Sequence, residues 1–172
     1  TRAQQRRSYM AATLVLACSF GAGPTVTDAV TGIDLISADN ATNTLANRQA
    51  NPITVGTNSY EKWVRLKITA TPANYVQSFK VWFNSTVDTS TTLNFTGAFV
   101  TYQVGTTAAS TIANANATTY TSGNKATWDL AQYTAAQTGV YTKYLALQLQ
   151  VAATAGPGNW TQQTVNYSYD EA

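Results

Sequence analysis

The sequence contains no histidine and only one cysteine, Cys18. Without histidine the chain cannot form a Ser-His-Asp or Cys-His catalytic constellation, or a metal site with histidine ligands. A single cysteine also excludes an internal disulfide and a zinc cluster built from cysteines. We therefore expect burial and hydrogen bonds to stabilise the fold, with Cys18 as a small, buried apolar residue.

Charged residues are also scarce, at 10% of the chain, and they are unevenly placed. Arg2, Arg6 and Arg7 give the first 27 residues a charge of +3, because the first acidic residue is Asp28. The remaining seven basic and eight acidic residues sum to −1. We therefore predict a basic N-terminal arm over residues 1–10, followed by a single domain over residues 11–172.

The arm has two interpretations at this level. Three arginines could contact phosphates, but they are few, and the chain carries no nucleic-acid-binding motif, so we expect no specific nucleic-acid partner. The alternative is a tether that lies on an acidic protein partner.

The N-terminus also has the outline of a signal peptide, since an apolar run from Ala11 to Phe20 follows the basic residues. That run is short, and Thr13 and Ser19 interrupt it, so it cannot span a membrane. We expect it to be the first strand of the mature domain, and we expect no membrane partner.

Period-2 alternation recurs along the chain between Gly-, Pro- and Asn-rich turns, and we find no convincing helix. The polar residues are mainly Thr, Asn, Gln and Ser, and Thr suits exposed strand faces. Residues 38–52 are polar and turn-rich, and we interpret them as a loop. About eight short strands predict an all-β fold, a two-sheet antiparallel β-sandwich or jelly roll with an extended N-terminal arm.

The stretch SYEKWVRLKIT, residues 59–69, concentrates charge in a strand of strict alternation. We predict that Val64, Leu66 and Ile68 face the core, and that the charges mark the outward face of the strand. The residues predicted to point outward on this strand are Trp63, Arg65 and Lys67. In the stretch FKVWF, residues 79–83, the same pattern turns Lys80 and Trp82 outward.

The outward aromatic residues have two interpretations. Trp63 and Trp82 would share one exposed or partner-covered face, and large aromatic residues with arginine are typical of protein interfaces. Together with Trp128, Trp160 and the ten tyrosines, they could instead form a stacking platform for sugars.

Catalytic and metal-binding patterns are weak. The spacing of the eight acidic residues suggests no pair of carboxylates across a cleft, so we expect neither glycosidase activity nor any other enzymatic activity. The stretch DNATN, residues 39–43, resembles part of a calcium loop but lacks the later glutamate, which leaves calcium binding by loop carbonyls open. We predict no cofactor and no metal site.

Three stretches carry a resemblance: GAGPTVTDAVTGIDLISADNAT, NPITVGTNSYEKWVRLKIT with FKVWFNS, and YLALQLQVAATAGPGNWTQQTVNYSYDEA. Over residues 20–172 the chain resembles virion structural proteins of tailed bacteriophages, of the small β-sandwich kind that decorates or cements capsids. The resemblance is one of style and order, with Ser-Tyr-Glu-Lys-Trp before a strand and a terminal Tyr-x-Tyr-Asp-Glu.

The resemblance implies a non-enzymatic protein on the capsid surface of a virion. Its partners would be the major capsid protein and copies of itself in a homo-oligomer. The residues expected at these interfaces are Arg2, Arg6, Arg7, Trp63, Arg65, Lys67, Lys80 and Trp82. The alternative is a carbohydrate-binding or adhesin-like β-sandwich domain, including a phage tail or head-fibre component.

Overall fold

The computed structural model describes residues 11–70, 74–83, 90–108, 115–156 and 164–172. The predicted arm, with Arg2, Arg6 and Arg7, lies outside these residues. The strands are β1 (Thr13–Phe20), β2 (Thr25–Thr27), β3 (Lys62–Ala70), β4 (Tyr75–Phe83), β5 (Thr91–Phe99), β6 (Ala115–Asn116), β7 (Ala126–Asp129), β8 (Tyr133–Thr134), β9 (Tyr144–Val151) and β10 (Val165–Glu171). The helical elements are α1 (Leu45–Ala50) and the 3-10 turns η1 (Ala117–Thr119) and η2 (Ala135–Gln137).

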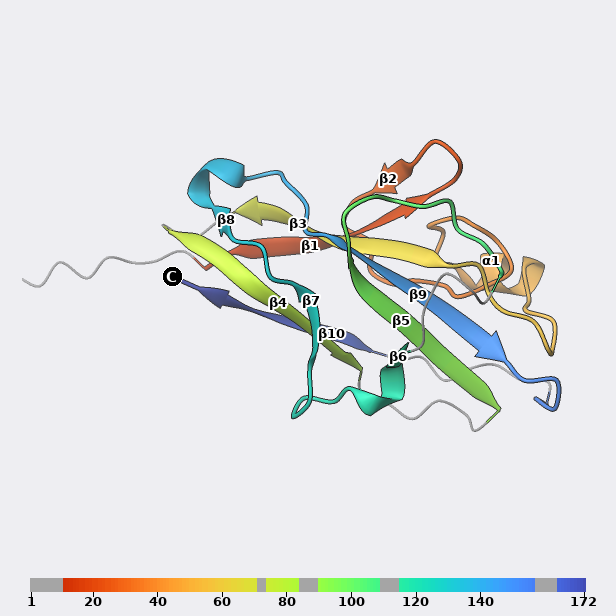
Figure 1. The fold of residues 1–172 in the computed structure, drawn as a ribbon. Helices are drawn as coiled ribbons and strands as arrows, with labels where there is room; N and C mark the ends of the chain where they lie inside the picture. The colour runs from red at the N-terminus through yellow and green to blue at the C-terminus, as the bar shows by residue number, and fades with distance from the viewer. Residues whose placement is uncertain (1–10, 71–73, 84–89, 109–114, 157–163) are drawn as a thin grey trace, which may run out of the picture.

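The strands form two antiparallel sheets. The six-stranded sheet has the order β2-β1-β3-β9-β5-β6, and the four-stranded sheet has the order β10-β4-β7, with β8 also paired to β4. In Figure 1, α1 and the C-terminal end of β10 lie at opposite ends of the molecule. The prediction of an all-β, two-sheet antiparallel sandwich is confirmed. The finer prediction of a jelly roll is not confirmed.

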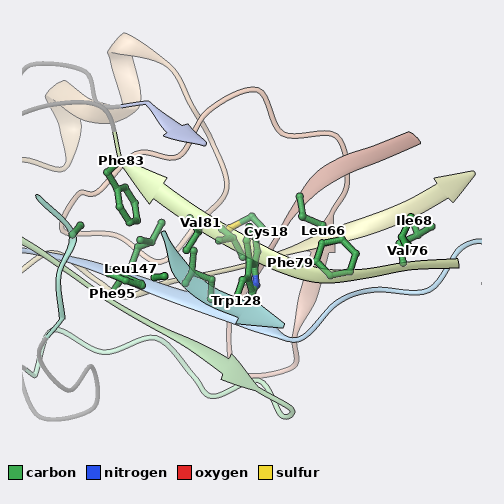
Figure 2. Close-up of a cluster of buried hydrophobic side chains, with 14 of the residues drawn as sticks. Cys18, Leu66, Ile68, Val76, Phe79, Val81, Phe83, Phe95, Trp128 and Leu147 are labelled. Carbon is green, nitrogen blue, oxygen red and sulfur yellow. The ribbon is translucent and has the colours of Figure 1, made fainter. Parts of the chain in front are cut away.

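The core lies between the two sheets, where the apolar residues of each alternating strand meet. From β3 it takes Val64, Leu66 and Ile68, as the alternation predicts. Figure 2 shows Phe79, Val81 and Phe83 of the opposite sheet in the same cluster. The prediction that Cys18 is buried is confirmed, and burial raises the pKa of its thiol to about 11, so it stays protonated at neutral pH.

A bulge in β4 adjusts the alternation so that the four-stranded sheet keeps its apolar side inward. Val76 and Phe79 are three positions apart, yet both side chains are fully buried in the core. Between them Ser78 adopts a φ of 57°, and the pairing with β10 shifts register between Ser168 and Asp170. An extra residue in one strand of an antiparallel pair turns the following side chains to the other face.

Two predictions about local structure are wrong. Residues 38–52 are not entirely a loop, because α1 begins after Thr44, whose side chain accepts a hydrogen bond from the backbone N–H of Asn47. The alternation of Val100, Tyr102 and Val104 in the sequence also predicts a strand, but β5 ends at Phe99 and these three residues form none. The triplet TGA at residues 96–98 predicts a bend or bulge, which a register shift between Thr96 and Phe99 confirms.

The two-sheet core should depend on the buried leucine of β3. Leu66 is fully buried, whereas Leu130 is 68% exposed. We expect Leu66→Ala to lower the free energy of unfolding by about 2–5 kcal/mol, because it removes apolar contacts and leaves a cavity. Leu130→Ala makes the same chemical change at the surface and should alter stability by less than about 0.5 kcal/mol. Urea unfolding followed by circular dichroism measures both, and equal losses would contradict the described core.

Candidate partner-binding faces

The residues predicted to form one interface lie on opposite sides of the sandwich. Arg65 and Lys67 belong to β3 in the six-stranded sheet, whereas Lys80 and Trp82 belong to β4 in the four-stranded sheet. In both strands the alternate residues fill the shared core. The outward residues therefore point in opposite directions, and the expectation of one face shared by Trp63 and Trp82 is wrong.

Trp63 is buried, so the prediction that it points outward to an interface is wrong. Its side chain is 1% exposed and belongs to a second apolar cluster on the outer side of the six-stranded sheet. The ring centroids of Phe99, Tyr102 and Tyr144 lie 4.8, 5.8 and 6.0 Å from that of Trp63. Trp63 therefore helps to attach the segment that follows β5, and it cannot contact a partner in this conformation.

The segment that covers this outer side is residues 99–108, which we call the covering segment. The carbonyl of Thr106 accepts a hydrogen bond of 3.0 Å from the backbone N–H of Glu61. The hydroxyl of Tyr102 donates to the carbonyl of Gly21 at 3.0 Å. Gly105 allows the close approach, since a Cβ at that position would lie 2.9 Å from the carbonyl oxygen of Glu61.

Two of the charges expected on the outward face are buried instead. Glu61 and Lys62 are each 1% exposed. Lys62 donates from Nζ to the carbonyls of Ala38 at 2.6 Å and Asn40 at 2.8 Å, and burial lowers the pKa of its ammonium group. Sequence alternation missed both because it separates the two faces of a strand but does not show which loops return to cover them.

Glu61 lies beside a second buried polar side chain under the covering segment. The register of β3 and β9, continued by one residue, places Glu61 opposite Gln148. Nε2 of Gln148 donates to the carbonyls of Ser59, Thr106 and Ala108 at 3.1–3.3 Å. Oε1 of Glu61 and Oε1 of Gln148 are both buried without a hydrogen-bond partner in the described residues. Burial raises the pKa of Glu61, because a neutral carboxyl group costs less to bury than a carboxylate.

Arg65 and Lys67 remain partly exposed on the same outer side, as predicted. Lys67 forms an ion pair with Asp28, whose other carboxylate oxygen accepts a hydrogen bond of 2.9 Å from the hydroxyl of Tyr141. The hydrogen bond from Lys67 lowers the pKa of Asp28 and raises that of Lys67. The guanidinium carbon of Arg65 lies 3.8 Å from the ring centroid of Tyr141 and 4.5 Å from that of Tyr144.

The outer face of the four-stranded sheet carries the other predicted residues. Lys80 is exposed and Trp82 is half-buried, so both point outward as predicted. Lys125, which was not among the predicted residues, precedes β7, and its Nζ lies 4.5 Å from the centre of the Trp82 ring. Lys125 also donates to the hydroxyl of Ser168 at 3.3 Å. We call Lys80, Trp82 and Lys125 the basic face.

No carboxylate neutralises the basic face within the described residues, since neither lysine takes part in a salt bridge there. The residues paired with Lys80 are Thr127 on β7 and Ser168 on β10, and Asn166 pairs with Trp82. Small, uncharged neighbours leave the face open and positively charged.

The predicted sugar platform does not form from Trp63 and Trp82. Trp128, a third candidate, is fully buried in the core, and Trp160 lies outside the described residues. A shallow hollow of about 430 Å³ is lined by neutral residues, among them Asn58, Thr92 and Gln150. It offers no carboxylate for acid–base chemistry.

Among the residues that the structure describes, no three acidic or cysteine side chains gather where they could hold a metal ion. In the same part of the chain, no helix has the length and apolar character needed to cross a membrane.

Comparisons with protein-family models, curated proteins and solved structures found no match to this chain.

Glu61 should make stability depend on pH. Because burial raises its pKa above the ordinary 4.5, the folded state holds the proton more tightly than the unfolded state. The contribution of Glu61 to the free energy of unfolding is therefore fully present below the pKa that Glu61 has in the unfolded chain. It is lost as the pH rises through the higher pKa that Glu61 has in the folded protein. We expect Glu61→Gln to remove this loss, so that the variant is more stable than the wild type at neutral pH. Urea unfolding across pH 4–8 measures the difference.

Asp170→Asn is the control, because it removes an exposed acidic residue from the same protein. The control should keep the decline of stability with rising pH. A decline of the same size in Glu61→Gln would show that another group causes it.

Proposed function

We propose that this chain is a non-enzymatic structural protein of a tailed-phage virion, which decorates the capsid surface and stabilises the assembled shell. The fold supports the proposal, because it is an all-β, two-sheet sandwich. The order of motifs over residues 20–172 resembles that of small decoration proteins expected to have this architecture.

The observation that carries the proposal is the basic face. It is a sheet surface with two lysines that form no salt bridge with any described residue, beside a half-buried tryptophan. Tryptophan supplies a large contact area, and positive charge without nearby carboxylates favours an acidic partner. We assign this face to contact with an acidic surface of the major capsid protein.

Stabilisation of the shell would follow from mass action. A protein that binds the assembled lattice, but not the free subunits, shifts the equilibrium toward assembly. Many copies with modest individual affinity are sufficient, which suits a face with two lysines and mostly neutral polar neighbours. The arm, with Arg2, Arg6 and Arg7, would extend the contact to an adjoining shell subunit or to another copy of this chain.

The basic face can be tested with variants of equal net charge. Lys80→Gln with Lys125→Gln removes two positive charges from it. Gln49→Glu with Val55→Glu adds two negative charges at exposed positions in and near α1, so both double variants have a formal net charge of 0 instead of +2. We expect the first pair to bind expanded capsids about tenfold more weakly in co-sedimentation, which corresponds to ~1.4 kcal/mol.

The control pair should bind nearly as well as the wild type, and rising salt should weaken wild-type binding. Equal affinity of both double variants would remove the basic face from the mechanism. A wild-type protein that ignores capsids but binds polysaccharide would favour the carbohydrate-binding alternative.

The arm is tested separately by deletion of residues 1–8. Three arginines leave with this segment, so we expect lower capsid occupancy and a lower melting temperature of the decorated shell. Differential scanning calorimetry of decorated capsids measures the shift. Unchanged occupancy and melting temperature would show that the arm plays no part in decoration.

A further inference from the structure

Arg65 is a partly exposed cation that forms no ion pair within the described residues. Its guanidinium group lies over the rings of Tyr141 and Tyr144, yet within the described residues it makes no ion pair and its Nε is buried without a hydrogen-bond acceptor. The strand pairings explain why Arg65 lies beside these two rings. Lys67, two residues after Arg65, pairs with Tyr141. Val64, the residue before Arg65, pairs with Leu145, the residue after Tyr144. The strands thus hold the charge against two aromatic rings.

The carboxylate of Asp28 interacts with Arg65 only through charge: the hydrogen bond from Lys67 and, to a smaller extent, the charge of Arg65 lower the pKa of Asp28. One oxygen of Asp28 binds Lys67 and the other accepts from the hydroxyl of Tyr141. This arrangement fixes Tyr141, whose ring carries the Arg65 guanidinium at 3.8 Å. Arg65 and Lys67 are positively charged and Asp28 is negatively charged, so this group of side chains carries one net positive charge.

Stacking determines which ligand would fit. Contact with aromatic rings occupies the flat faces of a guanidinium group and leaves its N–H bonds pointing outward in the plane. Because Nε is enclosed, the two terminal nitrogens are the donors that a ligand can reach. Two parallel N–H bonds match the two oxygens of a carboxylate, and an aromatic surround strengthens such a charge-assisted pair by excluding water.

We infer that Arg65 is an anchoring site for the carboxylate of an acidic side chain on a partner protein. A nucleic-acid backbone fits less well, because binding to repeated phosphates needs several cations and this group of side chains carries only one net positive charge. The site goes beyond the proposed capsid contact, since it lies on the opposite sheet from Lys80 and Trp82. It gives the sandwich a second, independent contact.

The test uses a single carboxylate and the whole chain. N-acetyl-aspartate amide is titrated at low ionic strength while ¹⁵N NMR follows the Arg65 side-chain signals. We expect a saturable shift in the millimolar range, which fades below about pH 4 as the probe becomes protonated. Sodium chloride at the same ionic strength is the control for screening and should give no saturable shift.

Arg65→Lys keeps the charge but loses the planar pair of donors, so the backbone signals around residue 65 should no longer respond to the probe. Lys80→Gln removes a charge from the other sheet and should leave binding unchanged. Absence of saturable binding in the wild type, retained binding in Arg65→Lys, or tighter binding of inorganic phosphate would each overturn the assignment. The titration needs no capsid, so its result is independent of the capsid-binding experiment.

Discussion

The covering segment is the constraint on which the outer organisation of this molecule depends. A sandwich needs only one buried face on each sheet, but here residues 99–108 also cover part of the outer side of the six-stranded sheet. The contact is built on main-chain carbonyls: that of Thr106 accepts from the backbone of Glu61 and from the side chain of Gln148. Trp63 fills the space beneath. The covering segment lies over the part of the outer side near Glu61 and Trp63, whereas Arg65 and Lys67, further along β3, remain partly exposed.

The covering segment explains why some features of β3 could be predicted from the sequence and others could not. Alternation identified Val64, Leu66 and Ile68 as core residues, because a half-buried strand repeats every two residues. The same alternation assigned Trp63 to the surface, because it carries no information about a segment some forty residues later. The signal that could have corrected it was chemical: Trp63, Tyr102 and Tyr144 are large aromatic residues that need a common site for burial.

For four residues of the candidate interface the outward direction was predictable from the sequence, but the surface they form was not. Lys80 and Trp82 point outward as the pattern indicates, and so do Arg65 and Lys67, but the strand order places the two pairs on different sheets. Lys125 joins Trp82 only through the pairing of β4 with β7, which no local pattern specifies. Non-local pairing therefore decides which charges act together. A sandwich with a cationic group on each side presents two separate charged surfaces that point in opposite directions.

Lys62 holds a loop in place through main-chain atoms alone. Its ammonium group holds the chain before α1 through the carbonyls of Ala38 and Asn40, and every amino acid supplies a carbonyl. The anchor itself therefore does not require a particular side chain at position 38, whereas the side chain of Asn40 is also hydrogen-bonded to Asn47 and to the backbone of Thr42. A single buried amine thus fixes a long connection through main-chain atoms, so the connection should tolerate replacement of Ala38 but not removal of the amine of Lys62.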